Sequence, residues 1–188
     1  MAKEPTAETL LSLFPEIEWI EDTGLREKVV AVWLQLWQAS RWQDLEALPV
    51  SGLLPQHSHI RHNRSVIHMA RHTADMFERF YDVQCDRDVL YAAALLQDAS
   101  KLLEYEPGSD GKPVKTEIGS ALEHPLLAVH EMLNAGLPLS VTETVWHHNP
   151  EARRFPARIE GLILYYCDQL DLVALEGHRW KRQITTFR

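Results

Sequence analysis

Hydrophobic positions along most of the 188-residue chain recur at helical spacing. The clearest run extends from Thr23 to about Trp42, where apolar residues follow the i, i+3, i+4, i+7 rule and Asp22 or Thr23 can cap the start. Further helices are predicted at about 63–81, 89–103, 126–133, 140–147 and 159–173, with a short amphipathic segment at 6–20. Neither a period-two segment nor a fixed-period repeat is present in the sequence. The pattern therefore predicts an all-α fold.

Glycine and proline interrupt the helical pattern between residues 43 and 61 and again between 108 and 113. The first interruption ends in the histidine-rich Gln56-His-Ser-His-Ile-Arg-His62. We interpret its three histidines as solvated loop residues, with a metal or phosphate site as the alternative. A chain of 188 residues, 45% of them hydrophobic, is long enough to bury one core and too short to favour a second domain. We therefore expect one compact domain.

Composition narrows the class of protein. The net charge of −8, without a dominant basic patch, argues against binding to duplex nucleic acid. Cys85 and Cys167 do not form a CxxC pair, so we expect reduced thiols that serve packing. The N-terminus lacks a signal-sequence pattern, and no apolar run approaches the ~20 residues needed to cross a bilayer. These features predict a cytoplasmic protein with no membrane partner.

Gln97 and Asp98 are the most unusual polar residues, because they end the apolar run Ala92–Leu96. Burying a carboxylate is costly unless it has partners, so Asp98 is a candidate functional residue. Lys101 follows Asp98 by one turn on the same side of the predicted helix. Its ammonium can neutralise a phosphate oxygen, or it can be a surface lysine favoured by the dipole of a helix C-terminus. Both interpretations of Lys101 stay open.

Other metal-ligating side chains occupy helical positions from which they can converge on Asp98. They are His68, His124, His147, His148 and Asp168. His68 and His72 stand one helical turn apart, a spacing that brings two imidazoles near one ion. Each position also has an ordinary explanation: N-capping for His124, a polar helix end for the histidine pair, and a buried salt bridge for Asp168.

In their order and spacing these residues resemble the HD superfamily of metal-dependent phosphohydrolases. That family has a histidine, a His-Asp doublet in an LLHDxxK context, one or two further histidines and a late aspartate. The corresponding residues here are His68, the run Leu-Leu-Gln97-Asp98-Ala-Ser-Lys101, His124-Pro125, His147-His148 and Asp168. The resemblance covers roughly residues 60–175. It implies a compact HD-type helical domain over 61–188, on which residues 1–60 pack as an N-terminal helical extension.

The resemblance implies metal ligands at His68, Gln97, Asp98, His124, His147, His148 and Asp168, with Asp98 bridging two ions. Gln97 stands where the family has a histidine, and a carboxamide oxygen is a weaker, harder ligand that suits Mg or Mn better. Three outcomes are open. Gln97 coordinates directly or through water, with His72 or His62 as substitute imidazoles; or only the site of Asp98, His124 and His147 or His148 is occupied; or metal binding is lost.

The function implied by the resemblance is hydrolysis of a phosphomonoester or phosphoanhydride in a small nucleotide or other phosphorylated metabolite. One or more divalent cations, with Mn, Mg, Fe, Co and Zn as the candidates, would activate the attacking water, and Asp98 and Lys101 would be the catalytic residues. Two alternatives belong to other classes: an HD-fold di-iron oxygenase, and a catalytically degenerate HD domain that binds ligands or partners. Homodimer formation also stays open.

Overall fold

The structure is a computed structural model, and it describes residues 5–109, 112–122, 124–148 and 155–176. Its helices and strands confirm the all-α prediction, because the only β-structure among these residues is a short hairpin and an isolated bridge. The elements are α1 (Ala7–Leu13), the 3-10 helix η1 (Pro15–Trp19), α2 (Thr23–Ala39), the 3-10 helix η2 (Leu45–Ala47), α3 (His59–Tyr81), α4 (Arg87–Leu96), α5 (Lys101–Glu104), β1 (Tyr105–Pro107), β2 (Pro113–Lys115), α6 (Glu117–Ala121), α7 (His124–Asn134), α8 (Leu139–Trp146) and α9 (Ile159–Glu176).

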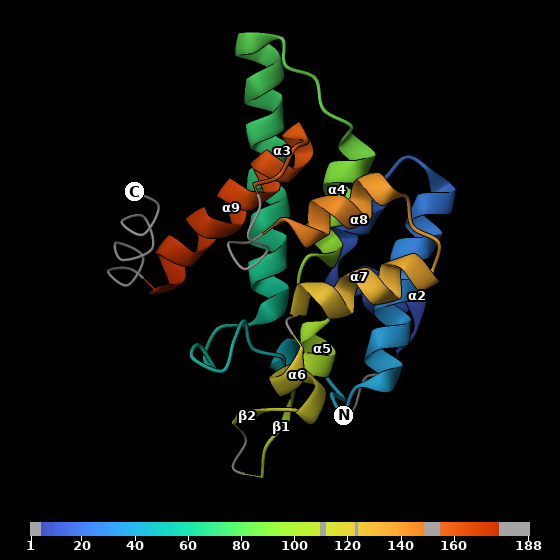
Figure 1. Ribbon diagram of the computed structural model, residues 1–188, viewed down its shortest axis with the longest axis vertical. Coiled ribbons are helices and arrows are strands. Elements are labelled where there is room, and N and C mark those ends of the chain that lie inside the picture. Colours follow the sequence, from blue (N-terminus) through green and yellow to red (C-terminus); the bar gives the residue numbers. More distant parts are fainter. Residues whose placement is uncertain (1–4, 110–111, 123, 149–154, 177–188) are drawn as a thin grey trace.

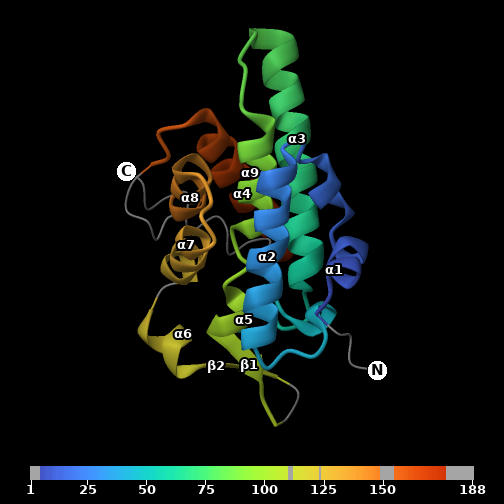
Figure 2. The same ribbon diagram turned by 90° about the vertical axis from the view of Figure 1, so that its right-hand side faces the viewer.

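Helix α4 occupies the centre of the bundle. Its residues from Val89 to Leu96 are all buried, since α2, α3, α8 and α9 pack around it. Figure 1 shows α9 crossing the long helix α3 on one side, with α7 and α8 on the other. Figure 2 shows α2 lying in front of α4, with α1 beyond it. Helices far apart in the sequence therefore meet around the C-terminal end of α4.

The N-terminal residues contribute to the same hydrophobic core as the rest of the chain. Phe14 and Trp33 are fully buried, and their rings lie 4.9 Å apart. The indole N–H of Trp33 donates to the carbonyl of Leu95 in α4, at 3.1 Å. Burial of two such large aromatic side chains stabilises the packing of the N-terminal segment on α2, and the Trp33 hydrogen bond joins α2 to α4. The division of the chain at residue 60 stays a prediction.

Several predicted boundaries were wrong. The helix expected over 89–103 ends at Leu96, and residues 97–100 form a turn in which the amides of Ala99 and Lys101 donate to the carbonyls three residues back. Such i to i−3 bonds tighten the backbone, so Asp98 leaves the helical register. Helix α3 begins at His59, four residues before the predicted start. The loop expected at 108–113 connects the antiparallel strands β1 and β2, in which Tyr105 pairs with Lys115.

Candidate metal centre

Asp98 lies in the turn after α4 and is 2% exposed. Its two carboxylate oxygens face different groups. Oδ1 lies 3.3 Å from Nε2 of His124 and 3.7 Å from Nε2 of His148. Oδ2 lies 2.8 Å from the Lys101 ammonium and 3.3 Å from Nε2 of His62. Four side chains from α3, α5, α7 and the end of α8 thus converge on one buried carboxylate.

His62 connects this carboxylate to two others on α9. Its Nε2 lies 3.2 Å from Oδ1 of Asp168, and its Nδ1–H donates to Oδ2 of Asp171 at 2.7 Å. The Ser65 hydroxyl donates to the other oxygen of Asp171, and the Gln169 amide donates to Asp168 at 3.0 Å. A carboxylate bonded to Nδ1 fixes the orientation of the ring and directs Nε2 towards the site, as carboxylate–histidine pairs do beside metal ions.

The Oδ1 side of Asp98 is built from the start of α7 and the end of α8. Nδ1 of His148 lies 2.6 Å from the carbonyl of Val145. A carbonyl only accepts hydrogen bonds, so Nδ1 carries a proton. Burial opposes charge on the His148 ring, but the carboxylate of Asp98 beside Nε2 raises the pKa of His148, so a cation at this nitrogen must compete with a proton. The rings of His124 and His148 meet edge to face with centroids 5.4 Å apart. The Ser100 hydroxyl donates to the carbonyl of His124 at 2.7 Å and holds the start of α7 against the turn.

The geometry fits one or two divalent cations. Two groups of ligating atoms, each within 4.8 Å of one another, share Asp98: the first is Asp98, His124 and His148, and the second is His62, Asp98 and Asp168. Ligands about 2.1 Å from an ion lie about 3.0–3.4 Å apart at octahedral or tetrahedral angles. The separations of Asp98 from His124 and His62 and that of His62 from Asp168 fall in this range, and His148 lies slightly farther from Asp98, at 3.7 Å. Asp98, Asp168 and Asp171 are three carboxylates that face one ammonium, that of Lys101, and the His62 imidazole, so a cation that displaces the proton of His62 would find negative charge to balance.

Gln97, beside Asp98, is fully buried. Among the described residues its Oε1 and Nε2 atoms have no hydrogen-bond partner. An unsatisfied buried polar group costs about 1–3 kcal/mol, so such groups are rare in folded proteins and are commonly explained by a water, an ion or a function. The Gln97 carboxamide therefore offers the centre a hydrogen-bond acceptor and a hydrogen-bond donor that no described residue uses. Coordination by Gln97 stays a prediction.

The charged groups of the centre stabilise one another. Burial alone would raise the pKa of Asp98, but the Lys101 ammonium and the imidazoles hold this pKa well below its usual range. Burial opposes the charge on Lys101 and His62 as well, yet Asp98 raises the pKa of Lys101, and hydrogen bonds to Asp168, Asp171 and Asp98 raise that of His62 well above its usual range. A metal ion must therefore compete with protons for this imidazole.

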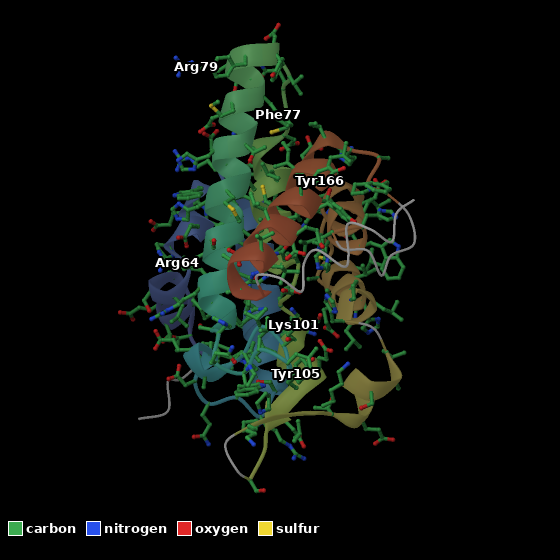
Figure 3. The ribbon with its side chains drawn as sticks, turned by 90° about the vertical axis from the view of Figure 1, so that its left-hand side faces the viewer. Arg64, Phe77, Arg79, Lys101, Tyr105 and Tyr166 are labelled. Atoms are coloured by element: carbon green, nitrogen blue, oxygen red, sulfur yellow. The ribbon has the colours of Figure 1, made fainter. Side chains whose placement is uncertain are left out.

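Four of the sequence-predicted metal ligands come together in the structure. They are Asp98, His124, His148 and Asp168. Lys101 joins them through its ion pair with Asp98, and only 11% of its side chain is exposed, so the surface-lysine interpretation was wrong. Figure 3 shows Lys101 inside the molecule, whereas Arg79 reaches outwards at the far end of α3.

His68 does not reach the centre, so its assignment as the first histidine is corrected. Its Nε2 lies 3.0 Å from Oε1 of Glu16, its ring packs against Trp19, and 48% of its side chain is exposed. His62 and His68 are six residues apart on one helix, which at 100° per residue places them on different faces. His72 bonds to the carbonyl of His68, and His147 bonds to the carbonyl of Glu143. Neither belongs to the two ligand groups found among the described residues.

Three residues of the centre were not assigned to it from the sequence. His62 was interpreted as a solvated loop histidine and named besides only as a substitute ligand, but it is buried in α3, and Asp171 was given no role. His59 was interpreted as solvated, but it is fully buried and its Nε2 lies 2.9 Å from the carbonyl of Asp98. A signal for His62 was available, because it precedes Val66 and Ala70 at steps of four on the buried face of α3.

The chain is similar to the dihydroneopterin 2',3'-cyclic phosphate phosphodiesterase of Methanocaldococcus jannaschii, with 34% identity over 113 residues. The similar region covers 60% of this chain and 45% of that protein, so it spans less than half of the relative. No family model matches the chain, and no solved structure does. In the described part of the chain, none of the helices has the length and apolar character to span a membrane. A phosphodiesterase relative and an all-α fold agree with the resemblance given by the motifs.

Proposed function

We propose that this protein is an HD-type metal-dependent phosphohydrolase that acts on a small nucleotide or other phosphorylated metabolite. The observation that carries the proposal is the convergence of two potential ligand groups on Asp98, a buried carboxylate in the turn after α4. The similarity to a phosphodiesterase supports hydrolysis at phosphorus. The name of that relative gives a 2',3'-cyclic phosphate as its substrate. A cyclic phosphodiester is therefore the first compound to test, beside phosphomonoesters and phosphoanhydrides.

The residues that would hold divalent cations are Asp98, His124 and His148 on one side and His62 and Asp168 on the other. A bound divalent cation supplies Lewis acidity, which acidifies water and polarises a phosphoryl oxygen. Gln97 is placed beside Asp98, and among the described residues its carboxamide oxygen has no hydrogen-bond partner. A mixed set of imidazole and oxygen donors suits Mn, Fe, Co or Zn, and additional oxygen donors favour Mn or Mg.

The chain's own residues contribute orientation and charge. Asp98 holds the two sides of the centre together, and Lys101 places a positive charge 2.8 Å from it. A buried ammonium attracts a phosphate anion more strongly than an exposed one does, because water screens it less. Asp171 orients the imidazole of His62, and the carbonyl of Val145 orients that of His148. Because these two imidazoles are already held in position, the side chains of the centre reorganise less during the reaction.

The test is a hydrolysis assay on the purified protein with Mn, Mg, Fe, Co or Zn added singly. The substrates are bis(p-nitrophenyl) phosphate, a 2',3'-cyclic nucleotide, p-nitrophenyl phosphate and a nucleoside triphosphate. We expect product release only with a cation present, and its loss with a chelator. Absence of hydrolysis with every cation would overturn the proposal, and dioxygen consumption in place of hydrolysis would assign the centre to the oxygenase class.

Asp98→Ala gives the sharpest variant for this assay. A metal ion contributes several kcal/mol to the transition state and each 1.4 kcal/mol is tenfold in rate, so we expect activity to fall on the order of a thousand-fold. The matched control is Asp75→Asn, because Asp75 is an exposed carboxylate on α3 that pairs with Arg87. This control should keep the activity of the unchanged protein.

A further inference from the structure

The backbone carbonyl of Asp98 is held from two directions. The amide of Lys101 donates to it at 3.0 Å within the turn, and Nε2 of His59 in α3 lies 2.9 Å from it. A carbonyl oxygen has two lone pairs and only accepts hydrogen bonds, so Nε2 of His59 is the donor. In a continued α-helix this carbonyl would accept from the amide of Leu102, but Leu102 donates to Ala99 instead. His59 therefore supplies a hydrogen bond at the point where the chain leaves the helical pattern of α4.

The first two turns of α3 contact this aspartate twice. His59 bonds to the backbone of Asp98, and His62, three residues later, lies 3.3 Å from Oδ2 of its side chain. Residues three apart in a helix share a face, so the helix itself fixes the two imidazoles relative to each other. The other oxygen of the same carboxylate faces His124 and His148. The distance of the carboxylate from these imidazoles therefore depends on where His59 holds the backbone.

The ring of His59 donates one hydrogen bond from an apolar setting. It is fully buried and meets the Trp33 ring edge to face, with centroids 5.9 Å apart. Burial lowers the pKa of His59 to about 3, so the ring is neutral and its one proton is on Nε2. Among the described residues its Nδ1 has no hydrogen-bond partner. An apolar ring would fill the space without an unpaired buried nitrogen, so the bond to Asp98 is what a histidine adds at this place.

We propose that His59 is a positioning residue of the centre, which holds the backbone carbonyl of Asp98 and thereby sets where the Asp98 carboxylate stands for a metal ion and for the substrate. The inference rests on the proposed function and adds a residue that acts through Asp98 without ligating an ion. The turn after α4 then keeps its shape through a side chain that α3 supplies. Loss of an outer partner that orients a ligand lowers metal affinity or activity by about 10–100-fold.

The test compares two replacements of His59. His59→Phe keeps an aromatic ring and removes the donor, whereas His59→Gln introduces an amide N–H that can donate to the same carbonyl. Titration of the metal-free proteins with Mn(II), with the unbound ion measured by electron paramagnetic resonance, gives the affinity. We expect His59→Phe to bind Mn(II) about 10–100-fold more weakly and to lose a similar factor in kcat, with little change in KM. His59→Gln should stay near the unchanged protein in both.

Asn63→Leu is the matched control, because Asn63 is a buried polar residue one turn after His59, and its amide nitrogen lies 3.5 Å from the carbonyl of Leu95 in α4. The control changes the same helix contact without removing the bond to Asp98, so it should keep the Mn(II) affinity. Circular dichroism shows which variants fold, and His59→Leu is a second variant without the donor. Nuclear magnetic resonance of the unchanged, metal-free protein with 15N-labelled histidine should show His59 as the Nε2–H tautomer.

Four results would overturn the inference: an Nδ1–H tautomer, undiminished Mn(II) affinity in His59→Phe, equal losses in His59→Phe and His59→Gln, or the same loss in Asn63→Leu. Hydrolysis that persists undiminished in His59→Phe would also overturn it and leave the proposed function standing. Mn(II) affinity that follows His59 without hydrolysis by the unchanged protein would overturn the proposed function alone. Absence of bound Mn(II) would overturn the inference, and absence of hydrolysis with every cation as well would overturn both.

Discussion

Two histidines of α3 lie in opposite surroundings, His62 in the first two turns of the helix and His68 in the turns that follow. His62 is 3% exposed and lies between Asp98, Asp168 and Asp171. His68, six residues later, has a half-exposed side chain and a single carboxylate partner, Glu16. The first stretch faces the end of α4 and helix α9, whereas His68 faces the N-terminal η1 region. The difference shows that the helical face of a histidine, more than its spacing from a distant motif, decides its chemistry.

Among the variants that test this comparison, His62→Ala should give the largest loss of stability. Removing the imidazole leaves Asp168, Asp171 and Asp98 without their shared donor, and breaking a buried charged group in this way costs about 3–5 kcal/mol. Urea denaturation followed by circular dichroism measures the free energy of unfolding. A loss below about 1 kcal/mol would show that the carboxylates do not depend on His62.

His59, one turn before His62, should make stability depend on pH. Burial lowers the pKa of His59 to about 3, so the ring stays neutral in the fold while the unfolded chain takes up a proton below about 6.5. Its contribution is therefore present above pH 6.5 and is lost as the pH falls towards 3. The slope is at most about 1.4 kcal/mol per pH unit.

The measurement for His59 is the free energy of unfolding of the unchanged protein and of His59→Gln between pH 7 and pH 4.5. The variant lacks the titrating ring, so its stability should fall less steeply and the gap between the two proteins should narrow with acid. The depressed pKa values of Asp98 and Asp171 also reduce stability at low pH in both proteins, and the difference between the curves removes that part. Parallel curves would contradict the neutral, buried state of His59.

Asp171→Asn tests the orientation of His62. The amide keeps the size of the side chain but weakens the bond to Nδ1, and loss of such an outer partner lowers metal affinity or activity by about 10–100-fold. The kcat and KM measured over a pH series separate this effect from a loss of fold. Asp88→Asn, at a partly buried carboxylate of α4 that accepts from the amides of Glu21 and Asp22, is the control.

His68→Ala should give the smallest effect. The His68 side chain is half-exposed, and Arg64 already donates to the same oxygen of the buried Glu16 carboxylate, so that oxygen keeps a partner and we expect a loss of about 1 kcal/mol or less in stability. Hydrolysis and Mn(II) binding should match those of the unchanged protein. Loss of metal binding in this variant would restore His68 as a ligand and reverse the comparison.

The helical pattern was enough to predict the all-α fold and most helix positions, because apolar spacing depends only on local periodicity. The metal-ligating residue types and the resemblance to the HD superfamily indicated that Asp98, His124, His148 and Asp168 could converge. The helical pattern placed the end of α4 incorrectly, since a helix that continues through Gln97 and a turn that begins there have the same apolar residues before them. Hydrogen bonds within the turn decide between the two, and they have no signature in residue spacing.

The sequence by itself therefore indicated side chains that are able to ligate a metal ion, among them Asp98, His124, His148 and Asp168, on segments that are far apart in the chain. Only the tertiary structure decided which α3 histidine joins them, because packing against α4 and α9 selects the face that carries His62 and leaves His68 towards Glu16. Tertiary structure also brought His124 onto Asp98 and Asp171 behind His62. These contacts form between segments up to 109 residues apart, where energies depend on burial and distance and not on local pattern.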